Sequence, residues 1–300
     1  MRTILILALG LGVSLQACGD EAGEGSVERV SVVASFYPLA FVAERIGGEC
    51  VSVTNLTPPG IEPHDIELSP DAVESIAAAD VVLYLGGGFQ PSIEDAVRDA
   101  SGEAVDLLDV VSVTPAEGEV AAEGLIVDPH VWLDPGSFAS IAEATGDVID
   151  RAGTASMCDV AESAASLRAD LEALDDDFHT SLGGCERDLI VTNHAAFGYL
   201  ASAYGLRQEA IAGLEPETEP DARRLAALID LVEREGVTTI LTEELVAPDV
   251  AETLAGEAGV RTGVLYTIEG LTDEESAVGE DYLSLMRKNL ETLRVALGCS

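Results

Sequence analysis

Short apolar runs and amphipathic segments alternate along the first half of the chain. The apolar runs have the length and β-branched content of strands, and the segments between them repeat apolar residues at helical spacing. The predicted strands are Val30–Ala34, Val51–Asn55, Val81–Leu85 and Ala104–Leu108. The predicted helices are Pro38–Ile46, Pro70–Ala79 and Ser92–Ala100. Strands that alternate with helices favour a parallel sheet covered on both faces.

The same alternation returns in the second half. Its predicted strands and helices are Asp188–Thr192, Asp221–Glu235, Thr238–Thr242, Pro248–Glu257, Val264–Tyr266 and Glu280–Leu297. Between the two series, apolar residues recur at steps of three and four from Val160 to Leu182. That spacing predicts one amphipathic helix of about 35 Å, at about 1.5 Å per residue. A coiled-coil seam between chains has the same spacing, but a single such helix within an α/β chain favours a connector.

We therefore expect an α/β protein of two lobes, each a mainly parallel sheet flanked by helices, joined by one long rigid helix. The expected boundaries are residues 30–153 for the N-terminal lobe, 154–183 for the helix and 184–300 for the C-terminal lobe. His179 lies on the connecting helix after three consecutive aspartates. We assign it to a solvated helix face and give it no function.

The charge of the chain is strongly negative. Asp and Glu number 55 against 15 Lys and Arg, for a formal net charge of -40. Nucleic-acid binding needs a basic surface, so the composition argues against a nucleic-acid partner. The regular apolar patterns and a hydrophobic content of 47% also argue against disorder.

The N-terminus has the pattern of an export signal. Arg2 precedes a short apolar run, and Leu15-Gln16-Ala17-Cys18 ends it. That ending resembles the lipobox of bacterial lipoproteins, which implies a signal peptide over residues 1–17, lipid on Cys18 and a tether over 18–29. A simple secretory peptide is the alternative. We expect an exported protein, anchored by lipid to the outer face of the cell membrane.

Four further cysteines remain: Cys50, Cys158, Cys185 and Cys299. An even number in an exported protein predicts disulfides, with three possible connectivities. We favour a bond between Cys185 and Cys299, both in the C-terminal half. A zinc–thiolate site is less favoured, because no two cysteines have close ligand spacing.

The segment Asp128–Pro135 carries one of four histidines, His130, and the only tryptophan, between two prolines that restrict the backbone. Imidazole is a common metal ligand, and a flanking carboxylate can accept the proton on its other ring nitrogen. A buried structural histidine beside a core tryptophan is the alternative. However, His64, His194 and Glu269 each follow a predicted strand, where α/β proteins bind ligands. Two candidates per lobe predict a metal site between the lobes.

Five segments together resemble the zinc/manganese solute-binding lipoprotein family of bacterial ABC importers. They are Pro59–Asp65, Asp128–Pro135, Asn193–Leu200, Thr242-Glu243 and Glu269–Thr272. The resemblance covers Val30 to Leu297 and implies His64, His130, His194 and Glu269 as ligands. Glu243 is the alternative to Glu269 as the fourth ligand, and otherwise has a supporting role or lines the cleft. The resemblance also implies an ABC permease partner, a monomer and no enzymatic activity. A His-rich loop common in zinc members is absent, since Pro115–Gly124 has no histidine.

Three imidazoles and one carboxylate suit four-coordinate zinc, whereas manganese favours more oxygen ligands. We therefore predict a zinc-binding protein that delivers Zn(II) to an importer, with manganese as the alternative cargo. A secreted zinc hydrolase is disfavoured, because the chain has no His-Glu-x-x-His motif and four protein ligands would leave no position for water. Adhesion to host surfaces stays open as a third function.

Overall fold

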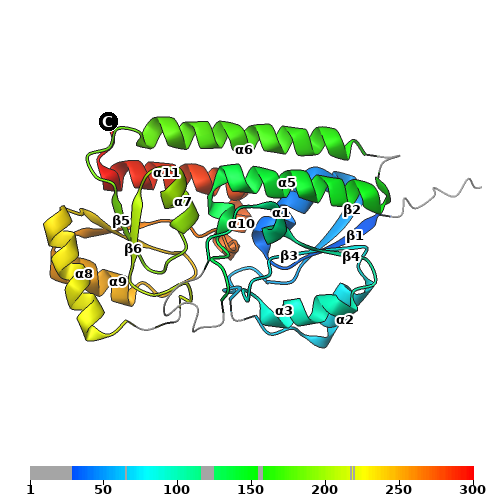
Figure 1. Ribbon diagram of the computed structural model, residues 1–300, viewed down its shortest axis with the longest axis horizontal. Helices are drawn as coiled ribbons and strands as arrows, with labels where there is room; N and C mark the ends of the chain where they lie inside the picture. Colours follow the sequence, from blue (N-terminus) through cyan, green and yellow to red (C-terminus); the bar gives the residue numbers. More distant parts are fainter. Residues whose placement is uncertain (1–28, 65, 116–124, 155–157, 217, 219) are drawn as a thin grey trace, which may run out of the picture.

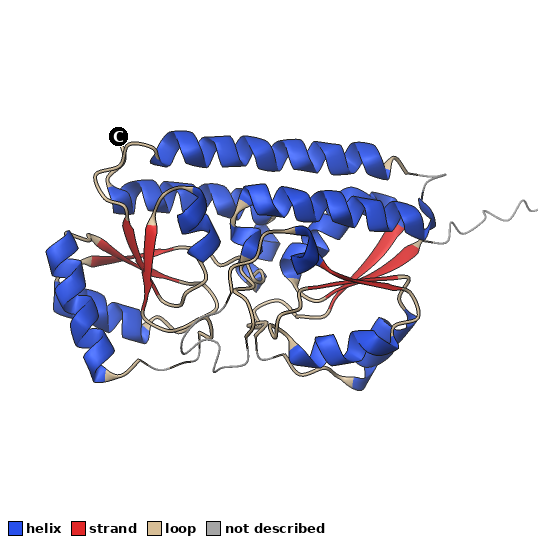
Figure 2. Cartoon of the chain, viewed as in Figure 1, coloured by secondary structure: helices blue, strands red, loops and turns tan. Residues whose placement is uncertain are grey.

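The computed structural model describes residues 29–64, 66–115, 125–154, 158–216, 218 and 220–300. Two lobes lie side by side beneath one long helix (Figure 1). Each lobe holds its own group of strands flanked by helices (Figure 2). This architecture confirms the predicted fold class of two α/β lobes.

The N-terminal lobe is built on a four-stranded parallel sheet in the order β2-β1-β3-β4. The strands are β1 (Val30–Ala34), β2 (Val51–Asn55), β3 (Val81–Tyr84) and β4 (Glu103–Asp106). Its helices are α1 (Tyr37–Gly47), α2 (Pro70–Ala78), α3 (Pro91–Ala96) and α5 (Pro135–Ile149). The core strands β1 and β3 are almost fully buried, as a sheet covered on both faces requires.

The C-terminal lobe repeats this topology with the order β6-β5-β7-β8, again all parallel. Its strands are β5 (Leu189–Thr192), β6 (Arg207–Ala210), β7 (Thr239–Thr242) and β8 (Arg261–Val264). Its helices are α7 (Gly198–Ala203), α8 (Ala222–Glu235), α9 (Asp249–Ala258), α10 (Asp273–Val278) and α11 (Tyr282–Leu297). The loops after the strands of both sheets can therefore supply one shared site.

The long helix α6 (Val160–Leu182) lies within the predicted range 154–183, spans the predicted apolar stripe and runs across both lobes in Figure 1. One stripe of it is buried: Val160, Leu167, Leu171, Leu174, Phe178 and Leu182. It packs closely on α5 at Gly146, where a Cβ atom would come within 2.8 Å of the Ala164 Cβ. Glycine at this position lets the two helix backbones approach.

A second helix, α11, also links the lobes. At its N-terminus the Tyr282 ring lies tilted against two phenylalanine rings, with centroids 4.4 Å from Phe138 and 5.6 Å from Phe41, and its hydroxyl donates to the carbonyl of Trp132. These three partners belong to the N-terminal lobe, whereas α11 ends in the C-terminal lobe. Because two helices that pack against both lobes connect them, we expect little hinge motion between the lobes.

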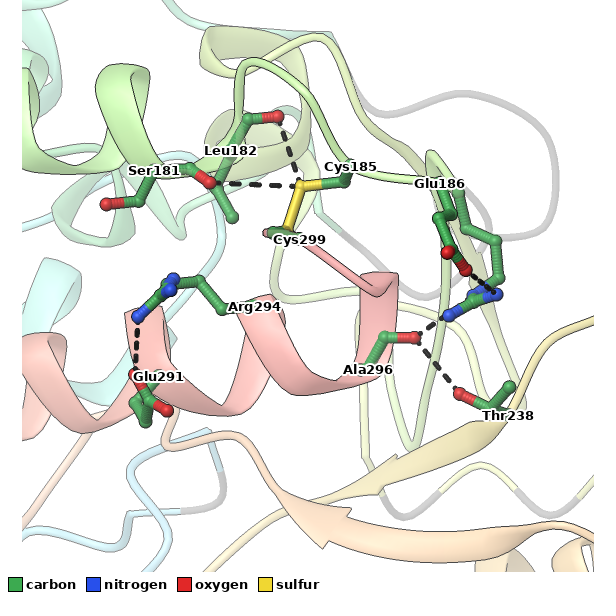
Figure 3. Close-up of a disulfide and its surroundings, with 10 residues drawn as sticks. Ser181, Leu182, Cys185, Glu186, Thr238, Glu291, Arg294, Ala296 and Cys299 are labelled. Atoms are coloured by element: carbon green, nitrogen blue, oxygen red, sulfur yellow. Dashed lines mark hydrogen bonds and ion pairs between the residues drawn. A yellow bond between two sulfur atoms is a disulfide. The ribbon is translucent and has the colours of Figure 1, made fainter.

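Disulfides fix both ends of α6. Cys185 bonds to Cys299, as predicted, and joins the chain after α6 to the end of α11 (Figure 3). Cys50 bonds to Cys158 and joins the chain before α6 to the start of β2. The bonded cysteines are 108 and 114 residues apart. Each bond lowers the conformational entropy of the unfolded chain and so stabilises the fold by an amount on the order of 4 kcal/mol.

The export signal falls outside the described residues, including the signal peptide, Cys18 and almost all of the tether. Most of the loop Pro115–Gly124 also lies outside the described residues. Among the helices that are described, none combines the length and the apolar character needed to span a bilayer.

Several elements depart from the predicted pattern, including the short helices α7 and α10, which were not predicted. β8 lies at a sheet edge and ends at Val264, whereas the apolar run predicts a strand that starts there. β6 was not predicted, since the edge strand Arg207–Ala210 is mostly polar. Helix α5 was not predicted either, because glycine, serine and alanine fill much of it. Asp134 caps α5 by accepting from the N–H groups of Gly136 and Ser137, so Asp134-Pro135 starts a helix.

The charge excess predicts that salt stabilises the fold. Repulsion among 55 acidic side chains, against 15 basic ones, destabilises the compact state in dilute buffer. Screening shortens the Debye length from about 10 Å at 0.1 M to about 3 Å at 1 M. We expect the metal-free protein to melt at a clearly higher temperature in ~1 M than in ~0.05 M sodium chloride. Calorimetry that shows no dependence on salt would contradict this expectation.

Candidate metal centre

His130 is fixed by the segment that connects the N-terminal sheet to α5. Its ring Nδ1 lies 2.8 Å from Asp128 Oδ1, which also accepts from the His130 backbone N–H at 3.0 Å. The next three residues form a short 3-10 turn, Val131–Leu133, in which the buried Trp132 packs 5.1 Å from the imidazole. With a carboxylate as its partner, Nδ1 carries the proton, so Nε2 presents a lone pair to the interior.

His64 follows β2 on a loop that contains Pro58, Pro59 and Pro63. Its imidazole is buried against Phe89, with the ring centroids 4.7 Å apart. Its Nδ1 lies 3.4 Å from Glu215 Oε2, a carboxylate of the opposite lobe. His64 therefore faces an acceptor across the lobe boundary, whereas the acceptor of His130 is local.

The C-terminal lobe contributes His194 and Glu269. His194 follows β5 by two residues, and its backbone N–H and Nδ1 both contact the carboxylate of Glu243, with the N–H bond at 2.9 Å. Glu269 follows β8, and its Oε2 accepts from the Thr267 hydroxyl at 3.2 Å. Glu243 thus supports His194 from outside the cluster, and Glu269 presents its other oxygen, Oε1, to the cluster.

The four predicted side chains meet at one point between the lobes. The Nε2 atoms of His64, His130 and His194 lie 3.4, 3.3 and 3.9 Å from Glu269 Oε1. All four ligand-type atoms lie within 4.8 Å of one another, and all four residues are buried. Among the described residues, this is the group of histidine, cysteine and acidic side chains that has metal-ligand geometry. His179, with a side chain 55% exposed, lies on α6 beside Asp175 and takes no part in it.

The cluster is rich in negative charge. Burial lowers the pKa of His64, but Glu215 and Glu269 outweigh it and hold this pKa well above its usual value. The pKa of His130 is raised in the same way, against burial, by Asp128 and Glu269. Burial disfavours the Glu269 carboxylate, yet the neighbouring histidines keep its pKa well below its usual value.

Glu244, which follows Glu243, shows the same excess of negative charge. Burial raises its pKa to about 8 despite hydrogen bonds from the backbone, and the Glu269 and Glu243 carboxylates add to the rise. Within the described part of the chain, no lysine or arginine contacts this buried group of carboxylates, and such an environment favours a bound cation.

Residues 32–296 match the family described as ZnuA, zinc-uptake complex component A, periplasmic. The chain belongs to this family. This description agrees with the family resemblance that the sequence predicts.

Similarity to two named zinc-binding proteins supports the same family assignment. The chain is 34% identical to the zinc-binding protein AdcA of Streptococcus pyogenes serotype M6 over 287 residues, which cover 89% of this chain and 56% of AdcA. The chain thus spans a little over half the length of that relative. It is also 32% identical to the high-affinity zinc uptake system protein ZnuA of Bacillus subtilis, over 94% of this chain and 93% of ZnuA.

Solved structures of ZnuA-like proteins share the fold. The Zn(II)-bound ZnuA-like domain of Streptococcus pneumoniae AdcA has a TM-score of 0.77 at 33% identity, over 90% of this chain and 99% of that domain. The laminin-binding protein Lmb of Streptococcus agalactiae has a TM-score of 0.80 at 26% identity, over 89% of this chain and 99% of Lmb. Lmb is described as bifunctional, with adhesin and metal transporting activity.

Two acidic residues around the site escaped prediction. Glu215 lies in a loop of glycine, proline and glutamate, where one acidic residue is indistinguishable by pattern from its neighbours. Glu244 follows Glu243 directly, and two adjacent acidic residues after a strand normally indicate a solvated loop. Only the tertiary contacts reveal that Glu215 contacts His64 and that Glu244 contacts the turn before Glu269.

Proposed function

We propose that this protein is an extracytoplasmic zinc-binding component of an ABC importer, and that His64, His130, His194 and Glu269 bind the transported Zn(II). One observation carries the choice of metal. The cluster brings three imidazole nitrogens to one carboxylate, whose Oε1 faces the three Nε2 atoms while its Oε2 accepts from the Thr267 hydroxyl. A set of three nitrogens and one oxygen suits tetrahedral zinc.

The supporting carboxylates fit the same role. Asp128 and Glu243 contact Nδ1 of His130 and His194, the arrangement that orients imidazole ligands of zinc. Manganese favours more oxygen ligands, and would need both oxygens of Glu269 or water to complete its shell. The zinc-binding names of the AdcA and ZnuA relatives support the same cargo.

A competitive loading experiment tests the cargo. Metal-free protein is exposed to equimolar zinc and manganese, desalted and measured by elemental analysis. We expect about one zinc per chain and little manganese, because the N/O ligand set favours zinc. Retention of manganese in place of zinc would assign the protein to manganese capture.

We also propose its setting. The protein is exported, held to the outer face of the cell membrane by lipid on Cys18, and acts as a monomer that passes zinc to an ABC permease. The Leu15-Gln16-Ala17-Cys18 sequence supports the anchor, as does a relative named zinc-binding lipoprotein AdcA. In this scheme residues 30–153 and 184–300 are the two lobes, and residues 154–183 connect them. Radiolabelled palmitate that is incorporated into the wild type and not into Cys18→Ala would support the anchor.

A further inference from the structure

The turn that presents Glu269 has an unusual backbone. Ile268 is the only residue other than glycine with a positive φ, 56°, in the described part of the chain. This conformation is rare for a β-branched residue and persists only where the surroundings enforce it. The turn directs the Ile268 side chain into the hydrophobic core and Glu269 into the metal cluster.

The peptide groups before Ile268 are held from two sides. The Glu244 carboxyl group accepts from the Thr267 N–H at 3.2 Å and from the Ile268 N–H at 3.0 Å. On the other side, the Thr267 carbonyl accepts from Trp132 Nε1 at 2.8 Å. Two successive N–H groups that point at one carboxyl group form a concave donor site, and this contact stabilises the turn.

We propose that Glu244 is a positioning residue of the metal site, whose carboxyl group holds the turn at Ile268 so that Glu269 Oε1 faces the three imidazoles. The inference rests on the proposed function. It divides the tasks of two adjacent residues after β7: Glu243 orients His194, and Glu244 orients Glu269. Glu244 reaches the metal only through Glu269, since its contacts are with the backbone of the turn and the Thr267 side chain.

A double-mutant cycle separates this role from a general effect. Zinc affinity is measured by competition with a chromophoric chelator for the wild type, Glu244→Ala, Glu269→Ala and the double variant. Loss of a partner outside the ligand shell weakens metal binding by about 10- to 100-fold, which we expect for Glu244→Ala. In the Glu269→Ala background the same change should lower zinc affinity by no more than about twofold, because the residue that Glu244 positions is absent.

Glu243→Ala is the matched control. It removes the neighbouring carboxylate, which acts through His194, so it should weaken binding in the wild type and again in the Glu269→Ala background. A cobalt(II) spectrum gives a second readout: the ligand-field bands of Glu244→Ala should move toward those of Glu269→Ala, and those of Glu243→Ala should not.

The conservative variant Glu244→Gln keeps the shape and one carbonyl acceptor. We expect it to fold and, without metal, to melt near the wild-type temperature. Its zinc affinity should lie between those of the wild type and Glu244→Ala. Wild-type affinity in Glu244→Ala, equal losses in both backgrounds, or failure of Glu244→Gln to fold would each overturn the inference. Wild-type protein that binds no zinc would instead overturn the proposed function.

Discussion

His130→Ala is expected to abolish tight zinc binding while the metal-free fold survives. The change removes one of four donors, and it also leaves Asp128 without the imidazole that it orients. Removing an outer partner typically costs about 10- to 100-fold in affinity, so loss of a ligand should exceed that range. Zinc titration against a chelator of known affinity measures the loss, and circular dichroism with thermal melting checks the fold.

His179→Ala is the matched control for His130→Ala. Both variants remove one imidazole from a chain with four, but the ring of His179 is half exposed on α6, next to Tyr204 and Asp175. We expect wild-type affinity and stability from it. An equal loss of zinc binding in the two variants would mean that the four clustered side chains do not form the site.

Much of the fold could be predicted because burial leaves a periodic pattern. The long helix was predicted within residues 154–183, and the observed helix Val160–Leu182 coincides with its predicted apolar stripe, because that stripe faces one way along the whole length. The central strands β1 and β3 were also predicted, because strands buried on both faces are continuous apolar runs. The edge strands β6 and β8 carry exposed polar residues, so their pairing leaves no apolar signal.

The clustering of the four candidate side chains could be predicted, whereas most of the carboxylates that contact them could not. His64, His130, His194 and Glu269 stand in segments that resemble a known family, and the structure brings their donor atoms within 4.8 Å. Asp128 is two residues from His130, so its partnership is local and could be anticipated. Glu215 contacts His64, which is 151 residues away in the sequence. Glu244 contacts Ile268, which is 24 residues away. No local sequence pattern predicts contacts over such separations.

Acid is expected to release zinc without unfolding the protein. In the metal-free state His64 and His130 have raised pKa values, so they take up protons above the usual histidine value of about 6.5. In the zinc-bound state that we propose, their Nε2 atoms would hold the metal and could not be protonated. Zinc affinity should therefore begin to fall above about pH 6.5 on acidification, with protons taken up as zinc leaves.

The same pKa shifts predict that the metal-free fold tolerates this acid. Stabilisation from a raised histidine pKa is fully present below about pH 6.5 and is lost as the pH rises through the folded value. Stabilisation from the lowered pKa of Glu269 is present above about pH 4.3 and is lost only as the pH falls through the much lower folded value. Between about pH 4.3 and 6.5 both contributions persist, because the protonated imidazoles pair with Glu269 in place of zinc.

Calorimetric titration in buffers of different ionisation heat measures the proton uptake, and thermal melting at each pH measures the stability. We expect affinity to decrease steeply from about pH 7 to pH 5 while the metal-free melting temperature changes little. Affinity that stays constant down to about pH 5 would contradict a shell of three histidines. Zinc loss that coincides with unfolding would show that Glu269 does not pair with the protonated histidines.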